Sequence, residues 1–261
     1  MHTVLLACEV LRPELEMLAA KMADPPEMHF LEQRLHDYPE QLRLRVQAAI
    51  DALEQAHSGD LAILCGYGLC GRGLCGVSTG RAVLILPRLH DCIPLLLGET
   101  QAAANASSRE GATFWISPGW LKYLLIPFYA ESHRRFELYA QKAGPIKAAR
   151  MVRAENALLS AYKAFCHIRW PEMGEDWVAG AQRIAGLANL PYAERPGRSG
   201  YMAEFLAGGK DPEKFLHLAP GQTPAMDGDG LIQAASCTPD GMPLDKAGHR
   251  GGQRQGPNRE D

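Results

Sequence analysis

Short apolar runs alternate with stretches of helical periodicity along the first 98 residues. Four of these runs have the length and composition of buried strands, at residues 3–8, 28–33, 61–65 and 82–87. Helical patterns begin at Pro13 and at Pro39, where proline suits the first turn, and a short helix is expected over residues 90–98. Such alternation predicts an α/β protein with a Rossmann-like parallel sheet and flanking helices.

The second half of the chain has a more helical pattern. A strand, a turn at Ser-Pro-Gly and a helix are expected from residue 113, and residues 131–165 are helical in composition, with the adjacent Cys166-His167 pair assigned to the same helical stretch. A loop and a helix are expected over 195–209, and a last short strand within 213–221. Three regions are therefore predicted: 1–110, an α/β half; 111–226, a helix-rich half packed on it; and 227–261, a disordered tail rich in Gly, Pro and charge.

Composition and charge exclude some classes of function. The net charge of −3 offers no basic field for nucleic acid, and no apolar run is long enough to predict a membrane span. The apolar N-terminus lacks a basic segment, so it is interpreted as a first strand and not as a signal peptide. Seven cysteines without an export signal indicate a reducing compartment, and a cytoplasmic location is expected.

A glycine-rich segment, CGYGLCGRGLCG at residues 65–76, follows the third predicted strand. Glycines after a strand let the backbone turn sharply and approach a ligand closely. Residues 66–71 match the G-x-G-x-x-G pattern of dinucleotide sites, but the acidic residue expected about 20 positions later would be Asp91, which follows a different strand. A tight loop or a site for another ligand is the favoured interpretation.

Cysteine and histidine residues gather at the predicted carboxyl ends of the strands, where sheets of this type bind ligands. Cys8 ends the first strand, Cys70 lies in the glycine-rich segment, and the segment PRLHDC places His90 and Cys92 after the fourth strand. Thiolate and imidazole suit Zn²⁺, and several thiols also suit an iron–sulfur cluster. Asp91 is a candidate to orient an imidazole.

A metal-free alternative uses the same residues. The expected helix after Pro87 would place its positive end near Cys92 and lower the pKa of that thiol. Cys92 or Cys70 would then act as a nucleophile with His90 as its partner. Trp115 and Trp120, on either side of the Ser-Pro-Gly turn, are candidates to line a pocket, although aromatic residues at such turns commonly belong to a core.

The segments GYGLCG, LPRLHDCIPLLLGE, FWISPGW and DPEKFLHLAPGQ together resemble domain-of-unknown-function family 1638 of bacteria and archaea, over roughly residues 3–225. Cys65 and Cys75 are not among the residues that carry this resemblance. The resemblance implies a genomic setting near corrinoid-dependent methyl-transfer systems. The positions that match the family pattern are Tyr67, Gly68, Cys70, Gly71, Pro87, Arg88, His90, Asp91, Cys92 and Gly119.

These observations lead to one main hypothesis and two alternatives. The chain is expected to bind a metal through Cys8, Cys70, His90 and Cys92, with zinc as first choice and an iron–sulfur cluster as second. Tyr67, Gly68, Gly71 and Arg88 are expected to contact a cofactor or small-molecule ligand.

In function, the centre would assist thiol- or corrinoid-linked methyl transfer. In zinc-dependent corrinoid:thiol methyltransferases a similar His-x-Cys pair and a distant cysteine hold the metal, although their barrel fold differs from the fold predicted for this chain. The partner would be a corrinoid protein or a methyltransferase. The alternatives are a non-catalytic accessory protein that binds a metal, corrinoid or small ligand, and the metal-free Cys/His thiol enzyme.

Overall fold

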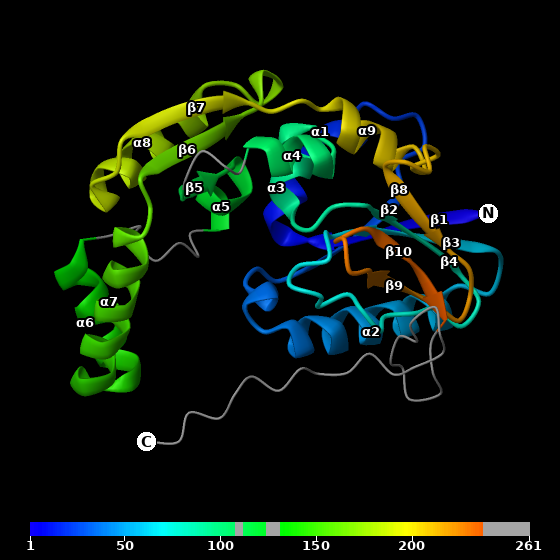
Figure 1. Cartoon of the computed structure of the whole chain (residues 1–261), viewed down its shortest axis with the longest axis horizontal. Coiled ribbons are helices and arrows are strands. Elements are labelled where there is room, and N and C mark those ends of the chain that lie inside the picture. The colour runs from blue at the N-terminus through cyan, green and yellow to red at the C-terminus, as the bar shows by residue number, and fades with distance from the viewer. Residues whose placement is uncertain (108–111, 124–130, 237–261) are drawn as a thin grey trace.

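A mostly parallel sheet of five strands, together with the helices packed on it, forms one part of the molecule, which we call the first lobe (Figure 1). The computed structural model describes residues 1–107, 112–123 and 131–236. Five strands are hydrogen-bonded in the order β2-β1-β3-β4-β8: β1 (His2–Cys8), β2 (Glu27–Leu31), β3 (Leu61–Gly66), β4 (Val83–Pro87) and β8 (Phe215–Leu218). β1 to β4 are parallel, and β8 pairs with β4 in the antiparallel direction. The predicted α/β fold is confirmed.

Helices cover both faces of this sheet, as the alternating pattern predicts. One face packs against α2 (Pro39–Ala56). The other face packs against a group of shorter helices: η1 (Glu9–Leu11), α1 (Arg12–Ala19), α3 (Cys92–Leu97) and α9 (Gly200–Leu206). All six residues of β3 are buried, as expected of a central parallel strand covered on both faces.

The helix α2 illustrates how the sequence produces this packing. Pro39 occupies the first turn, where its missing N–H breaks no helical hydrogen bond. Its buried side chains recur at helical spacing: Leu42, Val46, Ile50 and Leu53. Burial of each such side chain stabilises the fold by roughly 1.5–3 kcal/mol. The helix is therefore held mainly by its contact with the sheet.

A second sheet of three parallel strands has the order β5-β6-β7: β5 (Thr113–Ile116), β6 (Ala164–Arg169) and β7 (Tyr192–Pro196). The helices of this part are α4 (Gln101–Ser107), α5 (Pro118–Tyr123), α6 (Ser132–Ala143), α7 (Pro145–Ser160) and α8 (Asp176–Ala188). The helical assignment of Cys166-His167 is wrong, because both residues lie in β6. Tertiary pairing on both edges fixes the short segment as the central strand.

The end of the described chain returns to the first lobe. After α9, β8 joins the first sheet, and β9 (Gln222–Met226) pairs with β10 (Ile232–Ser236) in an antiparallel hairpin. The disorder predicted from residue 227 is therefore wrong for 227–236, because Ile232 is buried in the core beside α2 and anchors β10. The rest of the predicted tail, 237–261 with Cys237, lies outside the described residues.

Two hydrogen bonds are among the contacts that join the lobes. The indole N–H of Trp170, which follows β6, donates a hydrogen bond to the carbonyl of Leu96 in α3 at 2.8 Å. Arg195 of β7 donates to a carboxylate oxygen of Glu99 at 2.6 Å. Since Trp170 is fully buried in the core of the first lobe, the second sheet has a fixed position relative to the first. Within the described segments we find no helix with the length and apolar character needed to cross a membrane.

Candidate functional site

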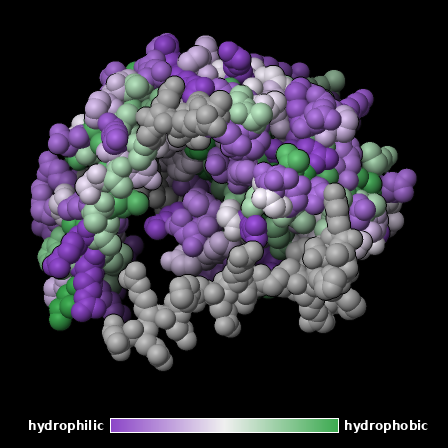
Figure 2. Space-filling model, viewed as in Figure 1, coloured by the Kyte–Doolittle hydropathy of each residue, from purple (hydrophilic) through white to green (hydrophobic). Residues whose placement is uncertain are grey.

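A cavity of about 430 Å³ lies at the carboxyl edge of the first sheet. Cys8 at the end of β1 and Gly66 at the end of β3 both line it. β2 pairs with one edge of β1, and the next strand along the chain, β3, pairs with the other edge. The cavity therefore lies at the topological switch point of the sheet, where ligands of such folds bind. Leu158 of α7 also lines the cavity, and Figure 2 shows the surface hollowed between the α6–α7 arm and the first lobe.

The glycine-rich segment lies directly against the PRLHDC segment. The N–H of Leu69 donates to the Leu89 carbonyl at 2.9 Å, and the N–H of Cys70 donates to the His90 carbonyl at 2.8 Å. Two motifs about 20 residues apart in sequence are thus one structural unit at the edge of the cavity. Gly68, predicted to contact a ligand, packs against the backbone of this second segment and is not among the residues that line the cavity.

Cys70 has a backbone conformation that is uncommon for a residue with a side chain. Its φ is 45°, and Gly71 and Arg72 follow with φ of 65° and 69°. A left-handed conformation at a non-glycine residue costs on the order of 1 kcal/mol, and such positions concentrate at functional sites. The conformation places Cys70 and Gly71 on the cavity wall.

Three cysteines from three separate segments line the cavity: Cys8, Cys70 and Cys92. Burial raises the pKa of Cys8 to about 11, and burial also raises the pKa values of Cys70 and Cys92, with a further contribution from the neighbouring thiols and Asp91. The lowered pKa expected for Cys92 from the α3 dipole is wrong, because burial outweighs the dipole of a six-residue helix. Without a cation, these thiols are protonated at neutral pH.

Asp91 also lines the cavity, but its role differs from the one expected. One carboxylate oxygen accepts a hydrogen bond from the N–H of Ile93 at 2.8 Å and caps α3. Capping places a carboxylate close to Cys70 and Cys92, where it disfavours their thiolate forms. Among the described residues, no hydrogen bond or ion pair joins the Asp91 carboxylate to the His90 ring.

His90 and Arg88 make contacts away from the cavity. The Nε2 atom of His90 lies 2.8 Å from the carbonyl oxygen of Gly230 in the β9–β10 turn. The Nε–H of Arg88 donates to the Pro212 carbonyl at 2.8 Å, and its Nη1 donates to the carbonyl of Ile232. Neither side chain lines the cavity. Of the four residues predicted as metal ligands, the structure brings the three cysteines to one cavity and directs the imidazole elsewhere.

Tyr67 contributes a polar atom without a partner. It lines the cavity, is 3% exposed, and its hydroxyl makes no hydrogen bond in the structure. Buried hydroxyls nearly always have a partner, so an unpaired one on a cavity wall indicates a place for a ligand atom. Burial, followed by the nearby thiols, raises the pKa of Tyr67 well above its ordinary value. The hydroxyl is therefore a neutral hydrogen-bond donor.

The segment after β2 and two aromatic residues form another part of the cavity wall. The segment after β2, from Glu32 to Asp37, lines the cavity together with Phe114 and Trp120. The Gln33 amide donates to the Gly119 carbonyl at 3.2 Å and holds this segment against α5. Of the two tryptophans considered, Trp120 lines the cavity, and Trp115 packs against the core of the first lobe, with the Arg195 guanidinium 5.8 Å from its ring centre.

Glu14 of α1 was not identified from the sequence. It is fully buried, and neither carboxylate oxygen has a hydrogen-bond partner. Burial raises its pKa to about 8, against a smaller lowering by its own backbone N–H and by the nearby Ser117 hydroxyl. Glu14 does not line the cavity, but α1 packs against α5, which carries Trp120. The sequence pattern of α1 is that of an ordinary amphipathic helix, and it does not mark Glu14 as a buried residue.

Comparisons with known proteins give a family and no activity. The chain has no match among curated proteins and none among solved structures. The family described as "Protein of unknown function (DUF1638)" matches residues 30–206, which include the glycine-rich segment, PRLHDC, the Ser-Pro-Gly turn and the whole second sheet. β1 with Cys8 and the β8–β10 region lie outside the matched residues. On this match, as the motifs predicted, the chain belongs to the DUF1638 family.

Proposed function

We propose that the chain holds a thiolate-ligated metal centre in the cavity, with Cys8, Cys70 and Cys92 as its ligands. The observation that carries the proposal is the arrival of these three cysteines, from three separate segments, on one cavity at the switch point of the sheet. Soft thiolate ligands select zinc, copper(I) or iron–sulfur clusters. The left-handed conformation of Cys70 adds support, because its energetic cost is explained if the thiol must occupy one exact place.

The protonation of the thiols is consistent with this role. A bound metal ion displaces thiol protons, so thiols that are neutral without a cation become thiolates when it binds. For a metal-free thiol enzyme the same raised pKa values are unfavourable, because the nucleophile would be protonated at neutral pH. We therefore prefer the metal centre to the metal-free alternative.

The spacing of the thiols bears on the identity of the metal. A single zinc ion with Zn–S bonds of about 2.3 Å places its sulfur ligands roughly 3.8 Å apart. The Sγ atoms of Cys8, Cys70 and Cys92 do not form a group in which all lie within 4.8 Å of one another. An iron–sulfur cluster is larger than a single ion and spreads its cysteine ligands further apart. The three thiols are therefore not arranged as a closed site for a single ion, and we propose a cluster held by three thiolates ahead of a zinc ion.

The reaction class rests on the resemblance and on the size of the cavity. With three protein ligands, a metal centre keeps a position for a substrate thiol, and the family setting suggests corrinoid-linked methyl transfer as the reaction. A volume of about 430 Å³ lies near the lower end of ligand pockets, which span about 300–1,000 Å³. The cavity suits a small thiol better than a corrinoid ring, so the corrinoid would come on a partner protein.

Metal and sulfide content tests the centre directly. The protein is purified without oxygen and without a metal-affinity column, and iron, zinc and acid-labile sulfide are measured in wild type, Cys8→Ser, Cys92→Ser and Cys70→Gly. Cys75→Ser is the matched control, because Cys75 belongs to the same glycine-rich segment but does not line the cavity. Cys70→Gly removes the thiol and also relieves the strain of the left-handed backbone, because glycine adopts this conformation readily. Loss of metal in this variant would therefore not result from unfolding.

We expect iron and sulfide in wild type and Cys75→Ser and their loss from the three cavity variants. Zinc in place of iron, with the same pattern of loss, would retain the centre and change its metal. Folded wild-type protein without metal would refute the proposal. Methyl transfer from a methylated corrinoid protein to a small thiol then separates an enzyme from the alternative of a non-catalytic accessory protein, which would bind without turnover.

A further inference from the structure

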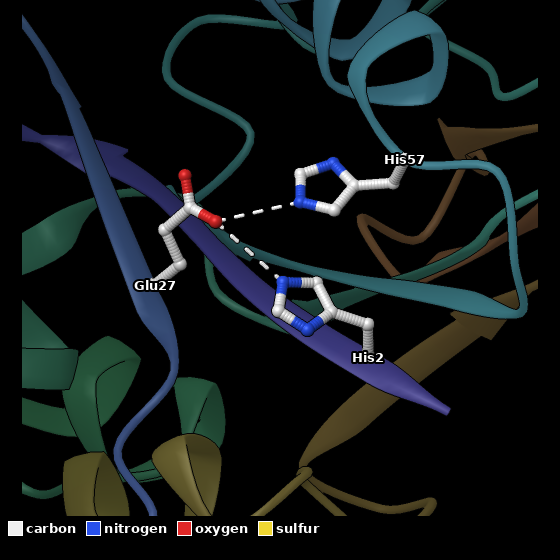
Figure 3. Close-up of side chains that lie close together, drawn as sticks. All are labelled: His2, Glu27 and His57. Carbon is white, nitrogen blue, oxygen red and sulfur yellow. Dashed lines mark ion pairs between the residues drawn. The ribbon is translucent and has the colours of Figure 1, made fainter.

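A second cluster of ligand-type side chains lies at the opposite edge of the first sheet. Figure 3 shows His2 at the start of β1, Glu27 at the start of β2, and His57, which follows α2 shortly before β3. Their ligand atoms all lie within 4.8 Å of one another, and no other group of three or more His, Cys, Asp or Glu meets this limit in residues 1–107, 112–123 and 131–236. The cysteine cavity is at the carboxyl ends of these same strands, so the two places are distinct.

The distances in this cluster match metal ligation better than direct hydrogen bonding. One oxygen of Glu27, Oε2, lies 3.5 Å from the His2 Nε2 atom and 3.4 Å from the His57 Nε2 atom. Charge-assisted N–H···O bonds are shorter, at about 2.7–2.9 Å. Ligands at about 2.0–2.2 Å from a tetrahedral zinc ion stand roughly 3.3–3.6 Å apart. Both separations have the length of an edge of that tetrahedron.

The tautomer of His57 supports the same interpretation. Its Nδ1 atom lies 2.9 Å from the carbonyl oxygen of Leu53, and since a carbonyl can only accept, Nδ1 carries the proton. In the neutral ring the Nε2 lone pair then faces the Glu27 carboxylate, an arrangement that a bound cation makes favourable. A hydrogen bond from one ring nitrogen to a backbone carbonyl is the usual support of a metal-binding histidine.

His29 and the stacking of the two rings complete the arrangement. The Nε2 atom of His29 lies 2.7 Å from Oε1 of Glu27, so the second carboxylate oxygen is held while Oε2 faces the two imidazoles. The rings of His2 and His57 stack with centroids 4.6 Å apart at 23°, which presents both Nε2 atoms to the same oxygen (Figure 3). Each group of the cluster has a contact that restricts its orientation.

We propose that His2, Glu27 and His57 bind a Zn²⁺ ion that clamps the amino ends of the first three parallel strands. Two imidazoles and one carboxylate are a ligand set that zinc accepts, with a fourth position for water or another ligand. About half of the His2 and Glu27 side-chain surface is exposed, so the ion reaches the site from solvent. This proposal does not depend on the cysteine centre.

Zinc titration by calorimetry tests the clamp, with the melting temperature as a second readout. The proteins compared are wild type, His57→Gln, Glu27→Gln, His29→Gln, Cys70→Gly and the double variant His57→Gln/Cys70→Gly. The control is His133→Gln, which removes an exposed His–Glu pair with Glu131 at 3.3 Å that forms no three-ligand group. Because Cys70→Gly weakens the cysteine site alone, it separates the failure of one proposal from the failure of the other.

We expect Cys70→Gly and His133→Gln to retain one zinc equivalent that His57→Gln and Glu27→Gln lose. His29→Gln should bind this equivalent about tenfold more weakly, as removal of the support of a ligand commonly does. Zinc should raise the melting temperature of Cys70→Gly and leave that of a His57→Gln/Cys70→Gly double variant unchanged. Equal stoichiometry in wild type, His57→Gln and Glu27→Gln, or an equal loss in His133→Gln, would overturn the proposal and leave the cluster as an ordinary surface ion pair.

Discussion

The backbone of Gly68 lies so close to the backbone of Asp91 that a Cβ atom at residue 68 would stand 2.6 Å from the Asp91 nitrogen. Real Cβ atoms do not approach backbone this closely, so only glycine fits. This contact explains why the glycine-rich segment and PRLHDC belong together. It also fixes the position of Cys70 relative to Cys92 across the cavity.

Gly68→Ala should therefore destabilise the protein and disturb the cavity. Forcing extra atoms into a packed region typically costs about 1–3 kcal/mol, and here the neighbour is backbone, which cannot turn aside. We expect a lower urea midpoint and loss of the metal held by the cysteines. Gly59→Ala is the control, because a Cβ at residue 59 meets nothing within 4 Å. Equal stability of the two variants would contradict the close approach.

Much of the first lobe could be predicted because its signals are local. Buried parallel strands give short apolar runs, and α2 gives a helical repeat with a proline at its start, so both elements follow from periodicity. The gathering of Cys8, Cys70 and Cys92 also followed, since the carboxyl ends of parallel strands share one edge. The glycines after β3 correctly indicated a close backbone approach, which Gly68 makes to the backbone of Asp91.

What the sequence did not predict depends on distant partners. The direction of the His90 ring is set by the Gly230 carbonyl, 140 residues away, and that of Arg88 by Pro212 and Ile232. Residues 164–169 became a strand because β5 and β7 pair with them on both sides. Residues 227–236 are ordered because β10, at the end of this segment, pairs with β9. No spacing within the sequence encodes such contacts.

Tyr67→Phe should separate stability from ligand binding. The substitution removes a buried hydroxyl that has no partner and keeps the ring, so the ligand-free protein should gain about 1 kcal/mol, whereas affinity for the cavity ligand should fall. Tyr201→Phe is the matched control, because the Tyr201 hydroxyl donates to the Lys214 carbonyl at 2.8 Å and its loss should destabilise. Chemical denaturation of both variants measures their free energies of unfolding. A destabilised Tyr67→Phe would contradict the prediction, because it would show that the Tyr67 hydroxyl has a hydrogen-bond partner.

Glu14 should make stability fall as the pH rises. In the folded chain its pKa is about 8 against an ordinary value of 4.5, so between these values the folded state holds a proton that the unfolded chain has released. In this pH window the free energy of unfolding should fall by at most about 1.4 kcal/mol per pH unit because of Glu14. Above pH 8 this contribution to the slope disappears, because Glu14 is ionised in both the folded and the unfolded state.

Glu14→Gln is neutral at every pH, so its free energy of unfolding should depend less on pH than that of wild type. The difference in unfolding free energy between Glu14→Gln and wild type should therefore favour the variant more at pH 8 than at pH 5. Urea unfolding at several pH values measures the slope. Glu16→Gln, an exposed position on the same helix, should leave it unchanged. If wild type and Glu14→Gln have parallel pH profiles, Glu14 is not a buried neutral acid.

Alkylation should show that the cavity thiols are slow nucleophiles in metal-free protein. With the pKa of Cys8 near 11 and an ordinary value of 9.0, its thiolate fraction at neutral pH is about 100-fold lower than that of a free thiol, and Cys70 and Cys92 are shifted in the same direction. Iodoacetamide labelling, followed by mass spectrometry, should therefore be about 100-fold slower at Cys8 than at free cysteine, and slower at Cys70 and Cys92 than in the urea-unfolded chain. The rate should rise with pH until the fold is lost. Fast labelling of Cys92 at pH 7 in folded protein would instead favour the metal-free thiol enzyme, because it would require a thiolate that burial and Asp91 oppose.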